Sequence, residues 1–561
     1  MSVLRTFVTG SVLLALAGLA RAQNPFDLPP RPNGPYEIRG VVVDANTGEP
    51  LPEVELSIQE SAQPTSPTFE VIQSDSNGKF RFANLAEGKY SVRASRQGYA
   101  EQEFLQHENF WTGIAVGPGK DSIHVRFPLR RSATIAGQVT DENGEAVRRA
   151  NVTLWTEQIE NGVRNITRVQ DVQTDDQGRY RLGHLLAGKY SVSIQATPWY
   201  SRYTLTGGIP AISGATTSTG KDTQIALPDV VYPVLYYPSV RDWHGMEWIN
   251  LQAGQGETAD FHLVPEPSVH LQVYVGTGGS GQRPNAALSM EFPGGGEGNV
   301  GGNTAVSDSG EMEISGIAAG SYRLQRAGGP TGFSGEGQRI DLSGSSELRL
   351  DEAPASGSAI RGVLRMEEGE LKVDQAILQL KDAQGHALNG LYVSAGGEGA
   401  NPTGSFAIEN VPAGPQVLQL SIVQPQDFVV KKIEAKGAKV SGTTIETDGT
   451  QEVNLIVTVA QSSSMIEGTA MKNGKPFAGA MILLVPEDGT EIERRVRRDQ
   501  SDSDGTFRLP MVLPGKYALM ALENGWEMEW SKPEVLRPFV GKAVKMKVLE
   551  GQVQSVVVEV E

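Results

Sequence analysis

The sequence predicts an all-β fold, organised as a tandem array of about five small β-sandwich domains. Three observations predict it. A motif with two glycines ten residues apart recurs five times along the 561 residues. The 65 glycines and 32 prolines suit short strands that tight turns connect. No long stretch has the 3.6-residue apolar period of a helix, so helices should be scarce.

The recurring motif describes a turn between two strands. It reads DSNGKFRFANLAEGKYSV from Asp75 and SDGTFRLPMVLPGKYAL from Ser503. Asp-x-Gly is typical of a hairpin turn whose glycine takes a positive φ. The alternation of Phe80, Arg81 and Phe82 indicates a strand with one buried face, and Gly-Lys-Tyr then opens the next strand. We therefore predict these structural turn glycines: Gly78, Gly88, Gly178, Gly188, Gly310, Gly320, Gly404, Gly414, Gly505 and Gly515.

A second shared segment precedes the motif. Strand, Asx-Gly turn and strand follow one another from Ile38, from Ile135 and from Ile466, with weaker versions from Ile360 and near Val269. The two halves together make a domain of about 100 residues with about seven strands, rather than a short solenoid repeat. The short links indicate that neighbouring modules touch. We place the modules at 36–130, 133–264 (with an aromatic-rich extra segment), 267–352 (divergent), 357–459 and 463–561, after a proline-rich lead-in at 23–35.

The first 22 residues predict export. Arg5 supplies a positive n-region, the 13 residues from Val8 to Ala20 are mostly apolar, and Ala20-Arg21-Ala22 is an A-x-A cleavage site. A membrane span needs about 20 apolar residues, so we expect a cleaved signal peptide and no spanning segment in the mature chain. The absence of cysteine excludes a lipid-anchored N-terminus. We therefore expect an extracytoplasmic protein, either periplasmic or secreted.

Charge and cysteine content narrow the partners and the chemistry. The chain has a net charge of −17, and removal of the leader takes away two arginines and no acid. Such an acidic surface repels phosphate backbones, so we expect no nucleic-acid partner. Zero cysteines exclude disulfides, thiolate metal sites and cysteine nucleophiles. We expect the partner to be a protein or a polysaccharide of the cell envelope or its surroundings.

The two shared segments resemble the carboxypeptidase regulatory-like domain. The opening pattern G-x-V-x-D and the closing pattern D-x-x-G-x-F/Y…L-x-x-G-x-Y both match, strongly in the first, second and fifth modules. The resemblance implies a transthyretin-like or immunoglobulin-like sandwich, related to a broader carbohydrate-binding-like fold. It also implies structural support or binding rather than catalysis. The fold alone does not establish the function.

We searched the sequence for catalytic and metal-binding patterns. His244 and Glu247 form an H-x-x-E pair, with His262 and His270 nearby, and imidazole and carboxylate groups can bind zinc. No α/β pattern surrounds them, and the spacing to the next histidine is too short for a metallocarboxypeptidase. Acidic turns such as the one at Asp502 lack the ligand spacing of a calcium loop. We therefore predict no catalytic site, no metal and no cofactor.

Aromatic residues gather in the extra segment of the second module. Flat aromatic faces bind sugar rings and peptide prolines, so this segment is a candidate binding surface. The alternative is that the rings fill the core of a larger sandwich or its junction with the third module, which is the commoner fate of aromatic side chains. The candidate residues are Trp199, Tyr200, Tyr236, Tyr237, Trp243 and Trp248.

Two further groups receive structural interpretations. We expect Trp526 and Trp530 to pack inside the fifth module. We expect the basic run Arg494, Arg495, Arg497 and Arg498 to form a solvated hairpin of an acidic protein.

The function that best fits these observations is that of a non-catalytic, exported scaffold or adhesion-type protein that binds a macromolecule at or outside the cell envelope. A carbohydrate-binding envelope protein is the alternative. A more remote alternative is an accessory part of a peptidase system.

Overall fold

The structure is a computed structural model. It describes residues 33–61, 68–120, 122–201, 228–274, 286–295, 297–299, 303–306, 311–327, 333–349, 358–367, 373–381, 387–395, 404–411, 413–424, 428–461, 464–489 and 495–561. The predicted signal peptide, most of the lead-in, Gly310 and Arg494 lie outside these residues. Among the residues described, no helix is both long enough and apolar enough to cross a membrane.

The strands assemble into five successive β-sandwiches, as the repeat predicts. In module 1, β4 (Lys79–Leu85), β1 (Tyr36–Asp44) and β8 (Ser122–Leu129) form one sheet, and β3 (Glu70–Gln73), β2 (Glu55–Glu60), β5 (Gly88–Ser95), β6 (Gln102–Glu103) and β7 (Ile114–Val116) form the other. In module 2, the sheets are β12 (Arg179–Leu185), β9 (Ala133–Thr140), β17 (Gly256–Thr258) and β18 (Phe261–His262), and β11 (Val163–Gln173), β10 (Asn151–Glu160), β13 (Gly188–Gln195), β15 (Leu235–Tyr236) and β16 (Ile249–Leu251).

Modules 3 and 4 repeat this plan. In module 3, the sheets are β23 (Asn303–Val306), β24 (Glu311–Ile317), β20 (Val269–Tyr274) and β27 (Ser346–Arg349), and β22 (Glu297–Asn299), β21 (Ala286–Glu291), β25 (Gly320–Ala327) and β26 (Phe333–Leu342). In module 4, they are β31 (Ser405–Val411), β28 (Ser358–Met366), β36 (Val453–Gln461) and β33 (Phe428–Lys436), and β30 (Ala387–Ala395), β29 (Val373–Lys381), β32 (Gly414–Gln424), β35 (Thr444–Thr447) and β34 (Lys439–Ser441).

Module 5 adds short helices to the same plan. Its sheets are β38 (Lys475–Pro476), β37 (Met465–Lys472), β41 (Thr506–Leu509) and β44 (Val553–Glu559), and β40 (Arg497–Gln500), β39 (Met481–Pro486), β42 (Gly515–Leu522) and β43 (Val544–Val548). The 3₁₀ turn η4 (Gly525–Glu527) and the helix α2 (Pro533–Val540) lie between β42 and β43.

All five modules share one strand order around the opening strand. That strand pairs antiparallel with the strand after the Asx-Gly motif and parallel with the closing strand of the module, as β1 does with β4 and β8. The strands β9, β20, β28 and β37 pair in the same way. Because the first and last strands run parallel, the chain enters a module at one end and leaves at the other. This order suits a chain of modules joined end to end.

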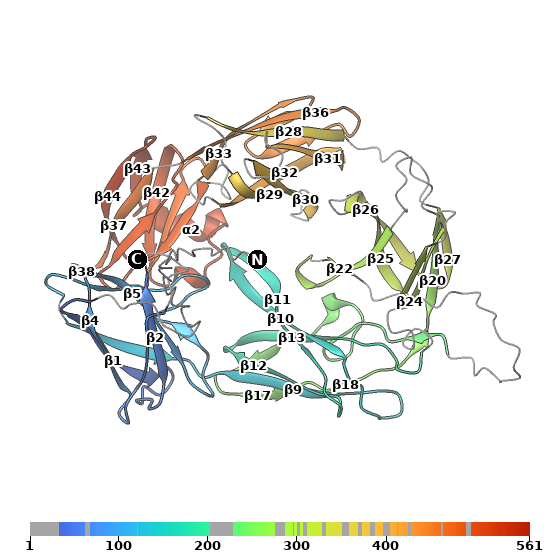
Figure 1. The fold of residues 1–561 in the computed structure, drawn as a ribbon, viewed down its shortest axis with the longest axis horizontal. Helices are drawn as coiled ribbons and strands as arrows, with labels where there is room; N and C mark the ends of the chain where they lie inside the picture. Colours follow the sequence, from blue (N-terminus) through green and yellow to red (C-terminus); the bar gives the residue numbers. More distant parts are fainter. Residues whose placement is uncertain are drawn as a thin grey trace, which may run out of the picture.

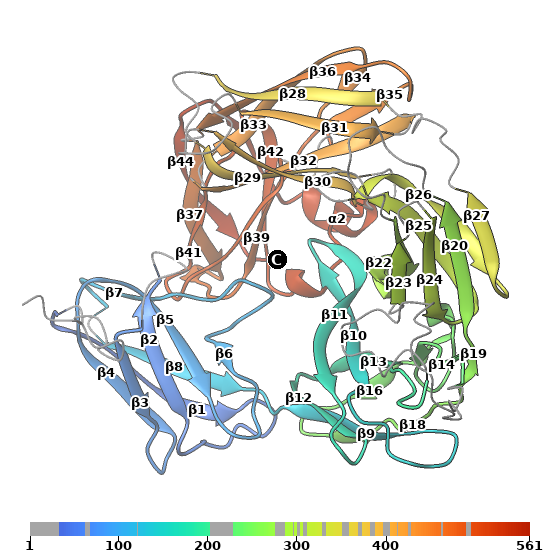
Figure 2. The same cartoon turned by 45° about the vertical axis from the view of Figure 1, so that its right-hand side comes forward.

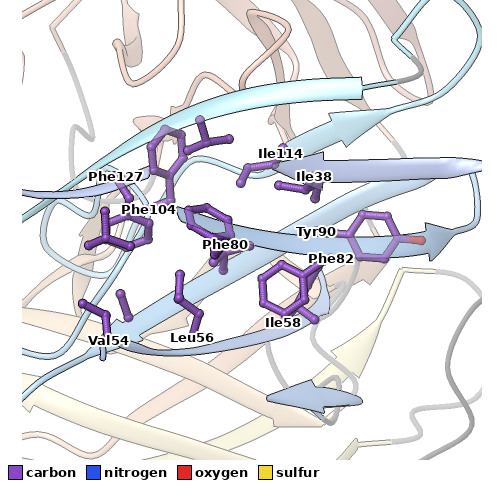
Figure 3. Close-up of a cluster of buried hydrophobic side chains, with 14 of the residues drawn as sticks. Ile38, Val54, Leu56, Ile58, Phe80, Phe82, Tyr90, Phe104, Ile114 and Phe127 are labelled. Carbon is purple, nitrogen blue, oxygen red and sulfur yellow. The ribbon is translucent and has the colours of Figure 1, made fainter. Parts of the chain in front are cut away.

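The motif residues have the positions that their pattern predicts. Phe80 and Phe82 are buried in the core of module 1, where they pack with Tyr90 of β5 and the apolar faces of both sheets (Figure 3). Gly78, Gly178 and Gly505 have φ values of 70°, 69° and 76°, in the left-handed region that favours glycine.

The second glycine of each motif has a different role. Gly88, Gly188, Gly320 and Gly515 are the first residues of β5, β13, β25 and β42, with φ outside the left-handed region. They therefore start a strand rather than form a turn. In module 4, Gly414 also starts a strand, β32, but it has a positive φ, as does the first glycine of that motif, Gly404.

The five sandwiches follow one another around a ring rather than along a line. In two views the modules succeed each other in chain order, and module 5 returns to lie beside module 1 (Figures 1 and 2). The long hairpin of β10 and β11 points from module 2 into the middle, toward α2 of module 5. Contacts between modules are therefore part of this fold.

The prediction of a solvated basic hairpin at residues 494–498 is wrong for the three arginines that the structure describes. Arg495 is 8% exposed and binds both carboxylate oxygens of Asp488 at 2.9 and 2.8 Å. Arg497 donates to the carbonyl oxygen of Met511 at 3.0 and 2.6 Å. Arg498 lies against another module. Arg495 is buried and Arg497 and Arg498 are half-buried, because each guanidinium finds fixed acceptors, which a pattern of charge alone does not reveal.

Candidate functional site

The aromatic segment of module 2 divides between core and surface. Tyr236, in β15, is fully buried, and Tyr237 packs on the same core with its ring edge-to-face to Phe261 at 6.4 Å. Trp248 is half-buried just before β16. For Tyr236 and Tyr237 the structure therefore matches the core interpretation rather than an exposed binding face.

Trp199 and Tyr200 follow β13 and lie at the surface. Trp199 is 67% exposed, and its ring meets that of Tyr200 edge-on at 5.7 Å. The hydroxyls of Tyr200 and Tyr232 both donate to the carboxylate of Glu142. Burial and the hydrogen bond to this carboxylate raise the pKa of Tyr200 to about 12. The tyrosine pair is thus held by the protein itself, and Trp199 is the one of the six candidate residues whose side chain is mostly exposed.

Trp243 occupies the turn η1 (Trp243–Gly245), which Asp242 caps. The Asp242 carboxylate accepts a hydrogen bond from the backbone N–H of His244 at 3.0 Å. Its Oδ1 also lies 2.8 Å from the imidazole Nδ1 of His244. The imidazole of His244 stacks on the indole at 3.8 Å with an interplanar angle of 25°. The hydrogen bonds lower the pKa of Asp242, so this carboxylate stays ionised beside the ring.

A cleft of about 430 Å³ lies beside this turn, between modules 2 and 3. Its module 2 wall includes Tyr232, Tyr236 and the Asp242–His244 turn, and its module 3 wall includes residues 316–323 and Arg339. The volume is within the range of about 300–1,000 Å³ that is typical of ligand sites. Two candidate residues, Tyr236 and Trp243, and the neighbouring Tyr232 therefore line one cleft, although the aromatic segment does not form a flat exposed face.

The cleft holds a buried hydroxyl that no described residue satisfies. Within the described part of the chain, the hydroxyl of Tyr236 has no hydrogen-bond partner. Burial raises the pKa of this phenol, which is therefore neutral and keeps its donor proton. A buried polar group without a partner costs about 1–3 kcal/mol, so such groups are uncommon and call for a bound water or ligand.

Charged side chains of both signs surround the hollow. Arg241 pairs with Glu266, whose other carboxylate oxygen accepts from the backbone N–H of Ala319 at 3.2 Å. Arg339 and Glu291 are exposed on the module 3 side. The lining therefore combines aromatic faces with fixed donors and acceptors, which is the usual composition of a small-ligand site.

The walls of the cleft are fixed by a histidine that bridges the two modules. His270 of β20 places Nε2 2.6 Å from Oδ2 of Asp229 and Nδ1 2.8 Å from Oε1 of Glu313. The imidazole thus lies within hydrogen-bond distance of one carboxylate from each of the two modules. Nearby, β14 (Val230–Val231) pairs with β19 (Glu266–Pro267), and η2 (Pro293–Gly295) contacts β11.

The histidines of the H-x-x-E search do not form a centre. His244 lies on η1, His262 on β18 beside Thr140, and His270 on β20. In the ranges that the structure describes, no three His, Asp or Glu side chains are grouped as a metal site would require. The acidic turn at Asp502 instead contacts module 1, as detailed below.

Comparison with known families bears on modules 1 and 2. Residues 37–130 and 134–225 each match the family model of the carboxypeptidase regulatory-like domain. Modules 1 and 2 carry carboxypeptidase regulatory-like domains. In both of these domains the matched segment begins at the opening strand, β1 or β9, and includes the strand pair that follows the Asx-Gly turn. The search of curated proteins found no match.

Solved structures give weak likenesses to all or part of the chain. The TIE protein of Bacillus anthracis is 11% identical, with 94% of this chain and 73% of that chain covered and a TM-score of 0.15. The minor pilin GBS52 of Streptococcus agalactiae is 11% identical, with 41% and 97% covered and a TM-score of 0.20. The shaft pilin SpaA of Lactobacillus rhamnosus GG is 11% identical, with 42% and 98% covered and a TM-score of 0.18. TM-scores this low establish neither a shared arrangement nor a shared function.

Proposed function

We propose that this chain is an exported, non-catalytic scaffold or adhesion-type protein that binds a macromolecule at or outside the cell envelope through the cleft between modules 2 and 3. The single observation that carries the proposal is the cleft of about 430 Å³ between the two modules, lined by the half-buried Trp243 and by Tyr236, whose hydroxyl has no partner among the described residues. A ligand that brings an acceptor to this hydroxyl would remove the cost of leaving it unpaired.

Several further proposals belong to this function. Cleavage after Ala22 would release the mature chain at Gln23, and the N-terminal sequence of the exported product tests it. A product that retains Met1 contradicts export. We also propose the module limits 36–130, 133–264, 267–352, 357–459 and 463–561, which are supported by the grouping of the strands into sheets.

A carbohydrate is the alternative ligand, favoured by one observation. The half-buried indole of Trp243 follows the ionised Asp242 and lines the same cleft as the exposed Arg339. An aromatic face next to charged hydrogen-bonding groups suits a sugar ring, whose C–H face stacks while its hydroxyls are bound. A folded protein partner would instead use the wider rim of both modules.

A glycan array and a pull-down with the purified full chain test both ligand classes. Trp243→Ala should reduce binding at least tenfold because it removes the aromatic wall of the cleft. Trp199→Ala is the matched control, since this indole is more exposed and does not line the cleft. Circular dichroism should show both variants folded.

The pattern of loss decides between the outcomes. Loss with Trp243→Ala and retention with Trp199→Ala support the cleft. Equal retention in both variants, or loss only with Trp199→Ala, contradicts it. Binding to a defined glycan supports the carbohydrate alternative, and capture of a protein without any glycan signal supports the scaffold.

A further inference from the structure

One sheet of module 5 is apolar on both faces. In β39 the consecutive residues Met481, Ile482, Leu483 and Leu484 are all buried, and β42 is buried continuously from Tyr517 to Leu522. A strand with one wet face alternates apolar and polar residues, so a continuous apolar run indicates cover on both sides. The inner face packs in the core between the two sheets of the module.

The outer face of this sheet carries a second apolar cluster. Its buried residues include Met481 and Leu483 of β39, Trp526 of η4 and Leu536 of α2. Phe110 of module 1 packs against it, although more than 350 residues separate it from these strands in the sequence. The imidazole of His107, also of module 1, lies parallel to the Trp526 ring at 5.3 Å with an interplanar angle of 5°. Module 1 thus supplies part of the cover that module 5 needs.

Backbone groups of module 1 bind the acidic turn that follows β40. The N–H of Gly113 donates to Oδ1 of Asp502 at 2.8 Å, and the carbonyl oxygen of Gly113 accepts from the N–H of Ser503 at 2.9 Å. The N–H of Ala115 donates to the Ser503 hydroxyl at 2.9 Å. Lys89 and Lys120 pair with Asp502 and Asp504 at the margin of the contact.

A buried glutamine joins the same two modules. The side chain of Gln500 donates to the carbonyl oxygen of Leu105 at 2.7 Å and to the Thr112 hydroxyl at 2.8 Å. Its oxygen lies 3.0 Å from Nδ1 of His107. Gln500 is only 2% exposed, so these partners in module 1 replace water for an amide that is otherwise costly to bury.

Arg498 lies where modules 1, 2 and 5 meet. Its guanidinium binds both oxygens of Glu108 at 3.1 and 3.0 Å and the side-chain oxygen of Asn161 at 2.7 Å. It also lies over the rings of Phe110, Trp526 and Trp530 at 5.2, 5.9 and 5.3 Å. A bidentate pair fixes orientation as well as distance, and stacking on aromatic rings adds attraction to the guanidinium.

The tip of the β10–β11 hairpin completes this junction. The carbonyl oxygen of Gly162 accepts from the N–H and the hydroxyl of Ser531 at 3.3 and 2.5 Å. A Cβ at Gly162 would lie 2.4 Å from the Trp530 ring, so the two surfaces are in close contact. The two strands have 10 and 11 residues, against 6 and 4 in β2 and β3 of module 1, and the extra length is what reaches module 5.

We propose that β40, the turn at residues 502–506 and the second apolar cluster of module 5, here called the clasp, dock on module 1 firmly enough to keep module 5 bound when the chain between modules 4 and 5 is cut. The clasp would then lock the five modules into a closed ring within one chain. The partner of this surface is module 1 of the same chain, because it fills the cluster, pairs the acidic turn and satisfies Gln500. The inference does not depend on what the cleft binds.

The test uses the intact folded chain with a site-specific protease sequence inserted between β36 and β37. After cleavage, size-exclusion chromatography with light scattering should show one species with the mass of one chain. Separate elution of module 5 from the cut chain would overturn the proposal. A mass of two chains would also overturn it, because the clasp would then join different molecules.

Exchanging the charges of the Arg498–Glu108 ion pair tests the contact between modules 1 and 5 specifically. Glu108→Arg, on a module 1 loop, should speed the release of module 5 from the cut chain at least tenfold, and Arg498→Glu should do the same. The double variant should recover most of the retention, which a merely misfolded module would not do. Unchanged retention in Glu108→Arg, or no recovery in the double variant, counts against the clasp.

Lys431→Ala is the matched control for the other neighbour of module 5. Lys431 of module 4 pairs with Glu367 of its own module and with Glu550 of module 5. If the clasp holds module 5, this change should leave retention in the cut chain within about twofold of the unaltered protein. Release of module 5 by Lys431→Ala alone would show that module 4 holds it, and the proposal would fail.

Discussion

Asp44 illustrates how single buried groups hold these modules together. Its carboxylate is 1% exposed and accepts from the backbone N–H groups of Asn46 and Thr47 at 2.8 and 3.0 Å. The Tyr99 hydroxyl and the Arg131 guanidinium bind its other oxygen. Burial alone would favour the neutral acid, but these hydrogen bonds outweigh it and lower the pKa of Asp44 to about 2.

This carboxylate predicts a pH dependence of stability. Because the folded pKa lies below the value of about 3.9 in an unfolded chain, the ionised form stabilises module 1 above pH 4. The contribution, on the order of 2 kcal/mol, is lost as the pH falls from about 4 toward 2. Asp44→Asn should therefore flatten the stability curve of the full chain in this window, as measured by urea unfolding.

The matched control for this change is Asp141→Asn in module 2. Asp141 accepts from the backbone N–H groups of Asn143 and Glu145 at the equivalent turn. The Asp141→Asn variant should leave the acid transition of module 1 unchanged. An unaltered curve in Asp44→Asn would contradict the role assigned to the Arg131 and Tyr99 contacts.

The unpaired hydroxyl of Tyr236 makes a second prediction at this scale. Tyr236→Phe should leave the free energy of unfolding unchanged or raise it by up to about 1 kcal/mol, because no described hydrogen bond is lost. Tyr190→Phe, in the same core, removes a donor to the carbonyl oxygen of Leu186 at 3.0 Å and should cost about 1 kcal/mol. Calorimetry of the two variants decides. A greater loss in Tyr236→Phe would mean that its hydroxyl is satisfied.

The turn glycines lead to a third prediction for single residues. Gly505 has a φ of 76°, and a Cβ there would lie 2.6 Å from the carbonyl oxygen of Ala470. Gly505→Val should therefore lower the melting temperature of module 5 and cost more than about 1 kcal/mol. Gly541→Ala is the control, since its Cβ would meet open space at an ordinary φ. Equal melting temperatures in the two variants would contradict the strained turn.

At the scale of elements, the β10–β11 hairpin has a role that goes beyond its own sheet. Its tip meets module 5 at Gly162, and a Cβ at Gly294 of module 3 would lie 1.9 Å from the carbonyl oxygen of Ile166 in β11. Trp155 of β10 also stacks on Phe292 of module 3 at 5.9 Å. One hairpin of module 2 thus contacts both module 3 and module 5 across the middle of the ring.

A substitution at its tip separates docking from folding. Gly162→Val adds bulk against Trp530 at a φ of 74°, so the hairpin tip should leave module 5. Hydrogen exchange should then speed up at the N–H of Ser531 by tenfold or more, while β9 and β12 of module 2 keep their protection. Unchanged exchange at Ser531 would contradict the contact, and loss of protection throughout module 2 would show that the change unfolds the module instead.

Much of each element could be predicted from local sequence. The alternation at Phe80 and Phe82 and the Asx-Gly turn at Gly78 depend only on neighbours in the chain, and both appear in the structure. The run from Met481 to Leu484 carries a local signal that the sequence analysis above did not use, because four consecutive apolar residues are typical of a strand covered on both faces. Trp526 and Trp530, which we expected to pack, are both buried.

The rest depends on contacts between modules, which no local pattern specifies. Arg498 meets Glu108 across 390 residues, so its neighbouring arginines in the sequence suggested a solvated run instead. The cleft likewise joins Trp243 of module 2 to Arg339 of module 3. The aromatic content drew attention to this segment, but the division of its rings between core, surface and cleft depends on the packing of the strands and of module 3.

In the molecule as a whole, the five β-sandwiches form a closed ring (Figures 1 and 2). Parallel first and last strands let the modules follow one another end to end, and such a chain could equally remain extended. The clasp and the contact of the β10–β11 tip with module 5 join modules that an extended string would leave apart. The ring therefore depends on a few specific contacts between modules rather than on the fold of any one of them.

Small-angle X-ray scattering of the full mature chain tests this claim most directly. A module of about 100 residues has a radius of gyration of about 13 Å and a diameter of roughly 34 Å, so five in a line would extend to about 170 Å. The ring predicts a maximum dimension well below that length and a pair-distance distribution with a single compact peak. Glu108→Arg should lengthen this distribution. A maximum dimension close to about 170 Å in the unaltered protein would contradict the closed ring.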